Sequence, residues 1–250
     1  MNIELVLQTF VAALITALAT GLGALPVVFL RHRTENVLAV AWAFAGGMML
    51  SASVFSLIVP ATEMGSPFSV LLGIVLGTVV FFMADKRLSE RHFKFGNIEA
   101  GSGGSTFLIM AVMVVHSFPE GVAIGVGFGS GELTFGILLT IAIAIHNIPE
   151  GTAISIPLYT GGASLGKCIW YSIFSSLPQP VAAIPAVILV SFFRELLPPA
   201  LGFAAGAMMY VVFSEFIPVA LKHQKGEVHA LAVMTGIVFM YLLQQLLTSG

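Results

Sequence analysis

The feature that most constrains this chain is a series of long apolar segments, each long enough to cross a lipid bilayer. A helix of about 20 apolar residues spans the hydrocarbon core. These segments are continuously apolar instead of alternating, which favours helices over membrane β-strands. Eight can be drawn, at about residues 5–30, 37–60, 67–84, 106–129, 133–157, 165–190, 199–220 and 228–247. The sequence predicts an all-α integral membrane protein with eight transmembrane helices in one domain, residues 1–250.

The composition argues against a soluble fold and against several classes of partner. Only 9% of the residues are charged and 58% are hydrophobic, whereas a soluble domain carries about 25% charged residues. No basic stripe indicates a nucleic acid, so none is expected. Cys168 is the only cysteine, which excludes an internal disulfide and a CxxC motif. The partners that remain are the lipid bilayer and small solutes.

The placement of basic residues predicts the orientation in the membrane. If the N-terminus lies outside, nine of the ten Lys and Arg residues fall on the cytoplasmic side and only Arg194 falls outside. Both termini are then outside, and residues 85–105 form a flexible cytoplasmic loop. The nine cytoplasmic residues are Arg31, Arg33, Lys86, Arg87, Arg91, Lys94, Lys167, Lys222 and Lys225.

A weak internal repeat occurs at a constant offset of 158 residues. Phe55, Ser56 and Pro60 match Phe213, Ser214 and Pro218, and Val80-Phe81 matches Val238-Phe239. Under the predicted orientation the matched helices cross the membrane in opposite directions. The pattern indicates an inverted repeat of helices 1–3 and 6–8, typical of transporters with a substrate site near the bilayer midplane.

A second repeat places four ionisable side chains at membrane depth. The sequence His116-Ser117-Phe118-Pro119-Glu120-Gly121 recurs as His146-Asn147-Ile148-Pro149-Glu150-Gly151 in the next apolar segment. A carboxylate at the centre of a membrane helix costs about 2.5–3.5 kcal/mol, so two copies indicate a cation site more strongly than structural hydrogen bonding.

In each copy the histidine and the glutamate are four residues apart and therefore share one helical face. Two imidazoles and two carboxylates suit zinc and, less selectively, iron, manganese or cadmium. We therefore predict His116, Glu120, His146 and Glu150 as metal ligands. Ser117 and Asn147 follow the histidines, and each could add an oxygen ligand or orient a carboxylate.

Two further polar residues are candidates for the ion pathway or for a second site. Gln179 lies at membrane depth in the sixth segment, within Ser175-Ser176-Leu177-Pro178-Gln179-Pro180. Glu215 lies toward the cytoplasmic end of the seventh. It fits an exit-path ligand or a proton acceptor, and an ordinary interfacial carboxylate equally well.

The paired motifs resemble those of the ZIP family of divalent-metal transporters, in particular its prokaryotic GufA-like branch. The resemblance implies a 3+2+3 helix arrangement, a metal bound between helices 4 and 5, and import into the cytoplasm. It implies His116, Glu120, His146 and Glu150 as the main ligands, with Ser117 and Asn147 at positions that help to hold a second metal in some members. Gln179 stands where related members often carry Glu, which favours one principal ion.

We therefore predict a transporter of divalent metal, zinc first, that works by alternating access in the plasma membrane, the inner membrane of a bacterium. No catalytic residue is assigned and no enzyme activity is expected. The alternative is an intramembrane metal-dependent hydrolase or oxidase, because zinc with an open position activates water. A metal sensor would need a signalling domain for which the chain has little room. A homodimer is left open.

Overall fold

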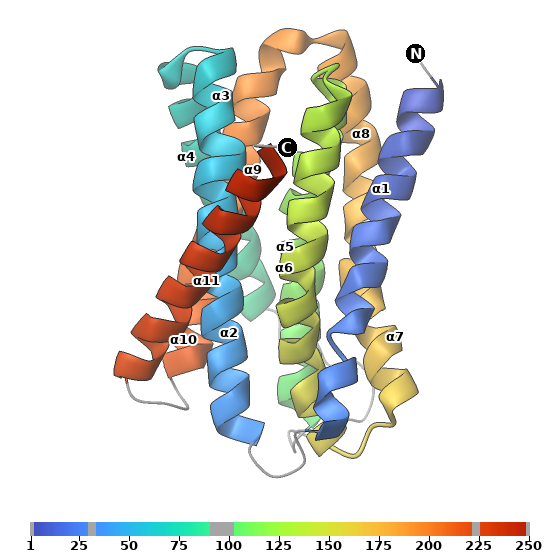
Figure 1. The fold of residues 1–250 in the computed structure, drawn as a ribbon, viewed down its shortest axis with the longest axis vertical. Helices are drawn as coiled ribbons and strands as arrows, with labels where there is room; N and C mark the ends of the chain where they lie inside the picture. The colour runs from blue at the N-terminus through green and yellow to red at the C-terminus, as the bar shows by residue number, and fades with distance from the viewer. Residues whose placement is uncertain (1–2, 30–33, 91–102, 222–225, 249–250) are drawn as a thin grey trace.

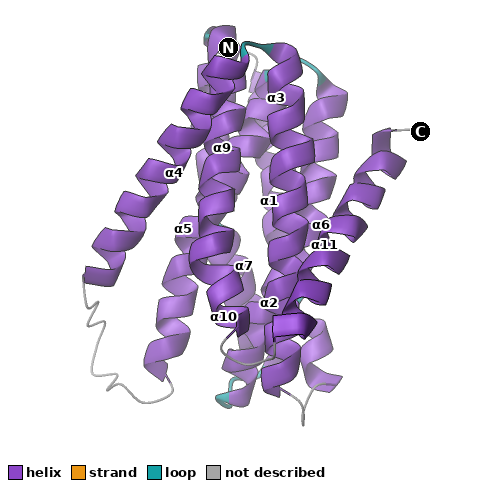
Figure 2. Cartoon of the chain, turned by 90° about the vertical axis from the view of Figure 1, so that its left-hand side faces the viewer, coloured by secondary structure: helices purple, strands orange, loops and turns teal. Residues whose placement is uncertain are grey.

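The chain forms a bundle of helices that run lengthwise through the molecule (Figure 1). The computed structural model describes residues 3–29, 34–90, 103–221 and 226–248, and these contain helices, turns and no strand (Figure 2). The α-helices are α1 Ile3–Leu22, α2 Thr34–Ser51, α3 Val59–Met64, α4 Pro67–Glu90, α5 Gly103–Gly129, α6 Leu133–Thr160, α7 Leu165–Ser176, α8 Pro178–Phe192, α9 Leu197–Val211, α10 Ile217–Leu221 and α11 Gly226–Thr248.

Seven helical stretches within these residues are long and apolar enough to cross a bilayer, and α5 adds a further helix of 27 residues. The all-helical, multi-pass fold is thus confirmed. The seven stretches are Ile3–Phe29, Asn36–Met64, Pro67–Arg87, Leu133–Thr160, Leu165–Phe192, Arg194–Leu221 and Gly226–Thr248.

The predicted loop at residues 85–105 is too long at both ends. The helix α4 continues to Glu90 and α5 begins at Gly103. One reason is that Tyr210 of α9 donates a hydrogen bond of 2.7 Å to Asp85, which holds the end of α4 against the bundle. Residues 91–102, with Arg91 and Lys94, lie outside the described residues, as do Arg31, Arg33, Lys222 and Lys225.

Two π-helical segments interrupt the second and seventh spans. They cover Ala52–Ile58 and Val212–Phe216, and the N–H after each bonds five residues back, from Val59 to Val54 and from Ile217 to Val212. A proline follows directly in both spans, Pro60 and Pro218. Because a proline ring clashes with the carbonyl four residues earlier, a widened turn relieves the crowding.

Four helix pairs account for much of the packing: α4 with α9, α2 with α11, α1 with α6, and α5 with α8. Glycines allow the helix backbones to approach closely in these pairs. A Cβ atom on Gly206 of α9 would lie 2.2 Å from the Ile74 carbonyl oxygen of α4, and one on Gly121 of α5 would lie 2.2 Å from the Gln179 carbonyl oxygen of α8. The packing brings α5 and α6 into the middle of the bundle, with α4 and α11 toward its outside (Figure 1).

Candidate metal site

The two motif helices form an antiparallel hairpin that sets both motifs at one depth. His116 lies 13 residues before the last residue of α5, Gly129, and His146 lies 13 residues after the first residue of α6, Leu133. Gly131, with a φ of 83°, makes the turn between the helices. Arg194 donates a hydrogen bond of 2.8 Å to the Ser130 carbonyl, which fixes the turn against the α8–α9 connection.

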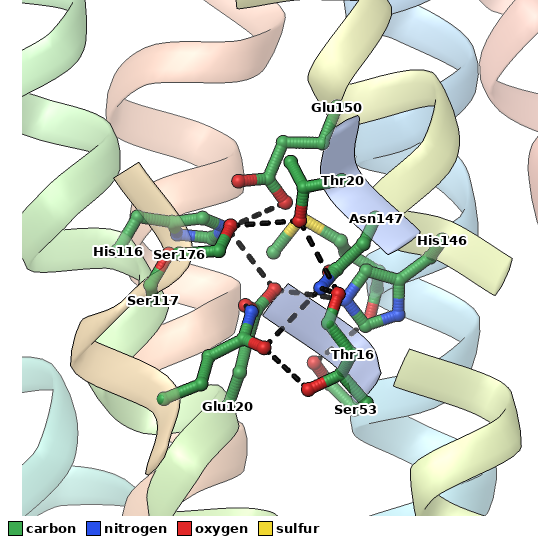
Figure 3. Close-up of polar contacts among 12 residues, drawn as sticks. Thr16, Thr20, Ser53, His116, Ser117, Glu120, His146, Asn147, Glu150 and Ser176 are labelled. Carbon is green, nitrogen blue, oxygen red and sulfur yellow. Dashed lines mark hydrogen bonds and ion pairs between the residues drawn. The ribbon is translucent and has the colours of Figure 1, made fainter. Parts of the chain in front are cut away.

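All four predicted ligands are completely buried and converge on one point (Figure 3). His146 Nε2 donates a hydrogen bond of 2.8 Å to Glu120 Oε1. His116 Nε2 lies 3.6 Å from Glu120 Oε1 and 3.9 Å from Glu150 Oε2. One ligand atom each from His116, Glu120 and Glu150 fall within 4.8 Å of one another.

These separations fit a shared metal ion. Two ligand atoms bonded to one tetrahedral zinc at about 2.1 Å lie about 3.4 Å apart. The His116 Nε2 distances of 3.6 and 3.9 Å are close to that value, so small side-chain adjustments suffice to enclose an ion.

Several polar atoms at this point have no hydrogen-bond partner in the protein. They are both carboxylate oxygens of Glu150, both ring nitrogens of His116, His146 Nδ1 and Asn147 Oδ1. Buried polar atoms are nearly always paired, and an unpaired carboxylate is the costliest of them. A bound cation would satisfy Glu150, His116 and Asn147 together.

A hydrogen-bond network lies on one side of the cluster. Gln179 donates from Nε2 to Glu120 Oε2, and Thr16 of α1 donates from its hydroxyl to Gln179 Oε1. The Asn147 amide donates to the Thr16 carbonyl at 3.0 Å and to Gln179 Oε1 at 3.4 Å. Thr20 and Ser176 share a hydrogen bond of 2.8 Å one helical turn away. The structure thus brings Gln179 and Asn147 to the cluster.

Ser117 and Glu215 are placed differently. Ser117 is completely buried, but its hydroxyl donates at 3.0 Å to the Met113 carbonyl of its own helix. Glu215 is half-buried and lines a small cavity of about 20 Å³, enough for about one water molecule. His116 lines the opposite part of this cavity, and Asp85, Tyr210 and Ser214 lie around it.

An aromatic side chain from the second π segment covers the cluster. The Phe216 ring lies 5.1 Å from the His116 ring, centroid to centroid, and packs edge-on against Trp42 of α2 at 4.6 Å. Both Phe216 and Trp42 are buried. Phe216 therefore shields His116 on the side of α2 and α9.

Sequence reasoning missed Thr16, Asp85, Tyr210 and Phe216. Thr16 and Thr20 are spaced by four residues on an apolar helix, and this was a usable signal for one polar face. Phe216 carried no such signal, because a phenylalanine in an apolar segment is expected everywhere.

The comparisons with known proteins agree with this site. The ZIP zinc transporter family matches residues 98–244, which include both motifs. The zinc transporter GufA of Myxococcus xanthus is 34% identical over 221 residues, covering 83% of this chain and 86% of GufA. The zinc transporter ZIPB of Bordetella bronchiseptica is 34% identical over 243 residues, covering 90% of this chain and 76% of ZIPB.

A longer protein of Arabidopsis thaliana is 37% identical over 93% of this chain, which spans only 38% of that protein. GufA and ZIPB are transporters, and nothing in these matches supports the alternative of an intramembrane hydrolase. The length of the matches, together with the paired motifs, establishes that the chain belongs to the ZIP family of metal transporters, as a multi-pass membrane protein.

Proposed function

We propose that this chain carries Zn²⁺ into the cytoplasm through a site between α5 and α6, held by His116, Glu120, His146 and Glu150. The observation that carries the proposal is the buried convergence of His116, Glu120 and Glu150 within 4.8 Å, with both Glu150 oxygens unpaired. Asn147 Oδ1 is a further oxygen donor at this point. Ser117 is the weakest candidate ligand, because its hydroxyl proton is used by Met113.

Charge balance supports a divalent cargo. Two ionised carboxylates and two neutral imidazoles carry a charge of −2, which one divalent cation cancels. A neutral complex crosses a low-dielectric region at far lower cost than a charged one. The nitrogen and carboxylate donors favour zinc, and iron, manganese and cadmium are the competitors to test.

The packing supports the 3+2+3 arrangement with an inverted repeat. An offset of 158 residues relates α4 to α11 and α2 to α9, so the pair α4–α9 corresponds to the pair α11–α2. The two π segments correspond in the same way, since Val212–Phe216 minus 158 gives residues 54–58. This exchange is the symmetry expected of an inverted repeat.

Charge placement supports the proposed orientation in the plasma membrane, which we take to be the inner membrane of a bacterium. Among the described residues, Lys86 and Arg87 end α4 and Lys167 begins α7, while Arg194 lies at the opposite end of the bundle in the α8–α9 connection. The homodimer stays a prediction, which native mass spectrometry of the purified protein would test.

The cavity beside His116 supports a release path toward the end of the bundle that carries Lys86 and Arg87. It joins the His116 ring to the carboxylates of Asp85 and Glu215. Carboxylates in succession let an ion exchange one set of oxygen ligands for the next. We place Glu215 on this path and not in the central site.

Hydrogen bonds support a division into two bodies that move relative to one another. Side chains link α1 to α8 through Thr16 and Gln179, α1 to α6 through Asn147, and α6 to α7 through Ser155 and Ser172. A separate pair of bonds, from Thr78 to the Gly206 carbonyl and from Tyr210 to Asp85, joins α4 to α9. The apolar cluster of Met48, Ala52, Ala142 and Met240 lies between α6 and the pair α2–α11.

The experiment is zinc flux into proteoliposomes that contain a zinc-sensitive dye. Wild type should show saturable uptake, and Glu150→Ala and His146→Ala should abolish or severely impair it. Glu195→Gln is the matched control, because Glu195 is an exposed carboxylate far from the site. Tight zinc binding with no uptake under any gradient would contradict transport. Competing iron, manganese and cadmium would rank the selectivity.

Orientation needs its own experiment. Single cysteines replace Glu195 or Lys86 in a Cys168→Ser background, where the natural cysteine is buried. A membrane-impermeant maleimide added to intact cells should label position 195 and leave position 86 unlabelled. The reverse pattern would refute termini on the outside.

A further inference from the structure

The oxygen atoms of the site are oriented by a network that begins on α1, a helix with no residue among the predicted ligands. Thr16 and Gln179 are both completely buried, and they are hydrogen-bonded although 163 residues apart in the chain. The network rests on the proposed metal site, and it determines which atoms of Glu120 and Asn147 face the ion.

The donors around Gln179 fix the orientation of its amide. The Thr16 hydroxyl has two acceptors in reach, the Ala13 carbonyl at 2.7 Å and Gln179 Oε1. Donation to Gln179 avoids an oxygen–oxygen repulsion at this short separation. The Asn147 amide also points at Oε1, at 3.4 Å. With two donors on its oxygen side, Gln179 must present Nε2 to Glu120.

This orientation makes the two oxygens of Glu120 unequal. Oε2 accepts the hydrogen bond from Gln179, and Oε1 faces His146 and His116, at 2.8 and 3.6 Å. Glu120 therefore offers one oxygen to the ion. With Oε2 committed to an amide donor, Glu120 cannot bridge to a second ion on the side of Gln179.

The same network orients Asn147. Its Nδ2 donates to the Thr16 carbonyl at 3.0 Å and to Gln179 Oε1, which turns the amide nitrogen toward α1. The oxygen Oδ1, buried and without a hydrogen-bond partner, is left toward the cluster. Figure 3 shows Thr16 between Asn147 and Glu120.

We propose that Thr16 and Gln179 are positioning residues that present Glu120 Oε1 and Asn147 Oδ1 to the ion and keep Glu120 monodentate, so that the site holds one ion. Neither residue needs to contact the metal. The effect acts through the geometry of two ligands, so changes in Thr16 should alter coordination as well as affinity.

The main variants are Thr16→Val, which keeps the shape and removes the hydroxyl, and Thr16→Ser, which restores the hydroxyl. Thr9→Val is the matched control. Thr9 is also buried on α1, but its hydroxyl donates only to the Leu5 carbonyl of the same helix, at 2.8 Å. Each purified variant is titrated with Zn²⁺ for affinity and with Co²⁺ for its visible absorption spectrum.

We expect Thr16→Val to weaken zinc binding by about 10-fold, the lower end for residues that orient a metal ligand, and to raise the flux KM by a similar factor with a smaller change in maximal rate. Its Co²⁺ spectrum should change, because the coordination number changes when Glu120 turns. Thr16→Ser and Thr9→Val should stay within about twofold of wild type, with unchanged spectra. Equal behaviour of Thr16→Val and Thr9→Val would overturn the proposal, as would a Thr16→Ser variant as defective as Thr16→Val.

The limit to one ion is tested by the number of Co²⁺ ions bound per protein. Wild type should bind one tightly, and Gln179→Glu, which replaces the amide donor by a carboxylate, should bind two. A wild-type value of two would overturn this part. Glu150→Ala separates the two levels of inference. If it leaves binding and flux intact the proposed metal site itself is wrong, whereas a silent Thr16→Val beside a dead Glu150→Ala refutes only the positioning role.

Discussion

His146 and Glu120 belong to different copies of the repeated motif, and their side chains meet at 2.8 Å. The two copies therefore do not form two separate His–Glu pairs. Glu120 is held by His146 and by Gln179, while Glu150 of the second copy has no hydrogen-bond partner and lies 3.9 Å from His116 Nε2. Two carboxylates with the same sequence context thus have different environments.

This inequality predicts opposite effects of neutralising the two carboxylates on the metal-free protein. Glu150→Gln should raise the free energy of unfolding by about 1–3 kcal/mol, because it removes a buried group without a partner. Glu120→Gln should lower the free energy of unfolding, because it places an amide against the His146 and Gln179 donors. Thermal unfolding in detergent with a chelator measures both. Zinc should then stabilise wild type and leave both variants nearly unchanged. A destabilised Glu150→Gln would show that Glu150 has a partner.

Acid should weaken zinc binding. Coordination needs neutral imidazoles and ionised carboxylates, so protons compete with the metal for all four ligands. Between about pH 7.5 and pH 5.5 we expect the apparent affinity to fall by about 10-fold or more, since an ordinary histidine titrates in this range. Isothermal titration at several pH values measures the fall, and proton release on binding should accompany it. An affinity independent of pH would exclude the histidines as ligands.

Close helix packing predicts a sharp response to added methyl groups. Gly206→Ala places a Cβ atom 2.2 Å from the Ile74 carbonyl oxygen, so α4 and α9 must separate. We expect a loss of about 1–3 kcal/mol, the usual effect of overpacking. Gly226→Ala is the control, because nothing lies within 4 Å of that position. Thermal unfolding compares them, and equal stabilities would argue against the α4–α9 contact.

The cavity beside His116 predicts a release defect for Glu215→Gln. Removing a carboxylate from the path should lower the maximal flux several-fold while the zinc affinity of the central site stays near that of wild type. Glu227→Gln, an exposed carboxylate at the start of α11, should leave both quantities unchanged. Flux and equilibrium binding separate the two effects. A loss of affinity equal to the loss of flux would move Glu215 into the central site.

The helical spans and the buried cluster followed from the sequence because both rest on strong local signals. Apolar segments of bilayer length leave a helix as the simplest backbone solution, and the spacing of His116 and Glu120 fixes one helical face. The end of α4 was placed too early because Asp85 and the basic residues after it read as loop. The hydrogen bond from Tyr210 that holds this end involves a residue 125 positions away, and no local pattern reports it.

The site was incomplete for the same reason. Gln179 was noticed because a polar residue at membrane depth is rare, but its partner Thr16 satisfies one backbone carbonyl locally and so resembles an ordinary helix threonine. The roles of the two carboxylates also could not be separated, because the motif repeats and only the tertiary contacts distinguish Glu120 from Glu150. The π segments were missed although Pro60 and Pro218 had been matched.

The bond between Thr16 and Gln179 also bears on how the protein is made. The α1 helix leaves the ribosome long before α8 does, and both motifs are synthesised between them. A nascent chain that already contains His116 to Glu150 therefore still lacks Gln179, the residue that positions Glu120. Metal coordination in its final form thus belongs to the end of biogenesis, and chains truncated before α8 should be poor traps for cellular zinc.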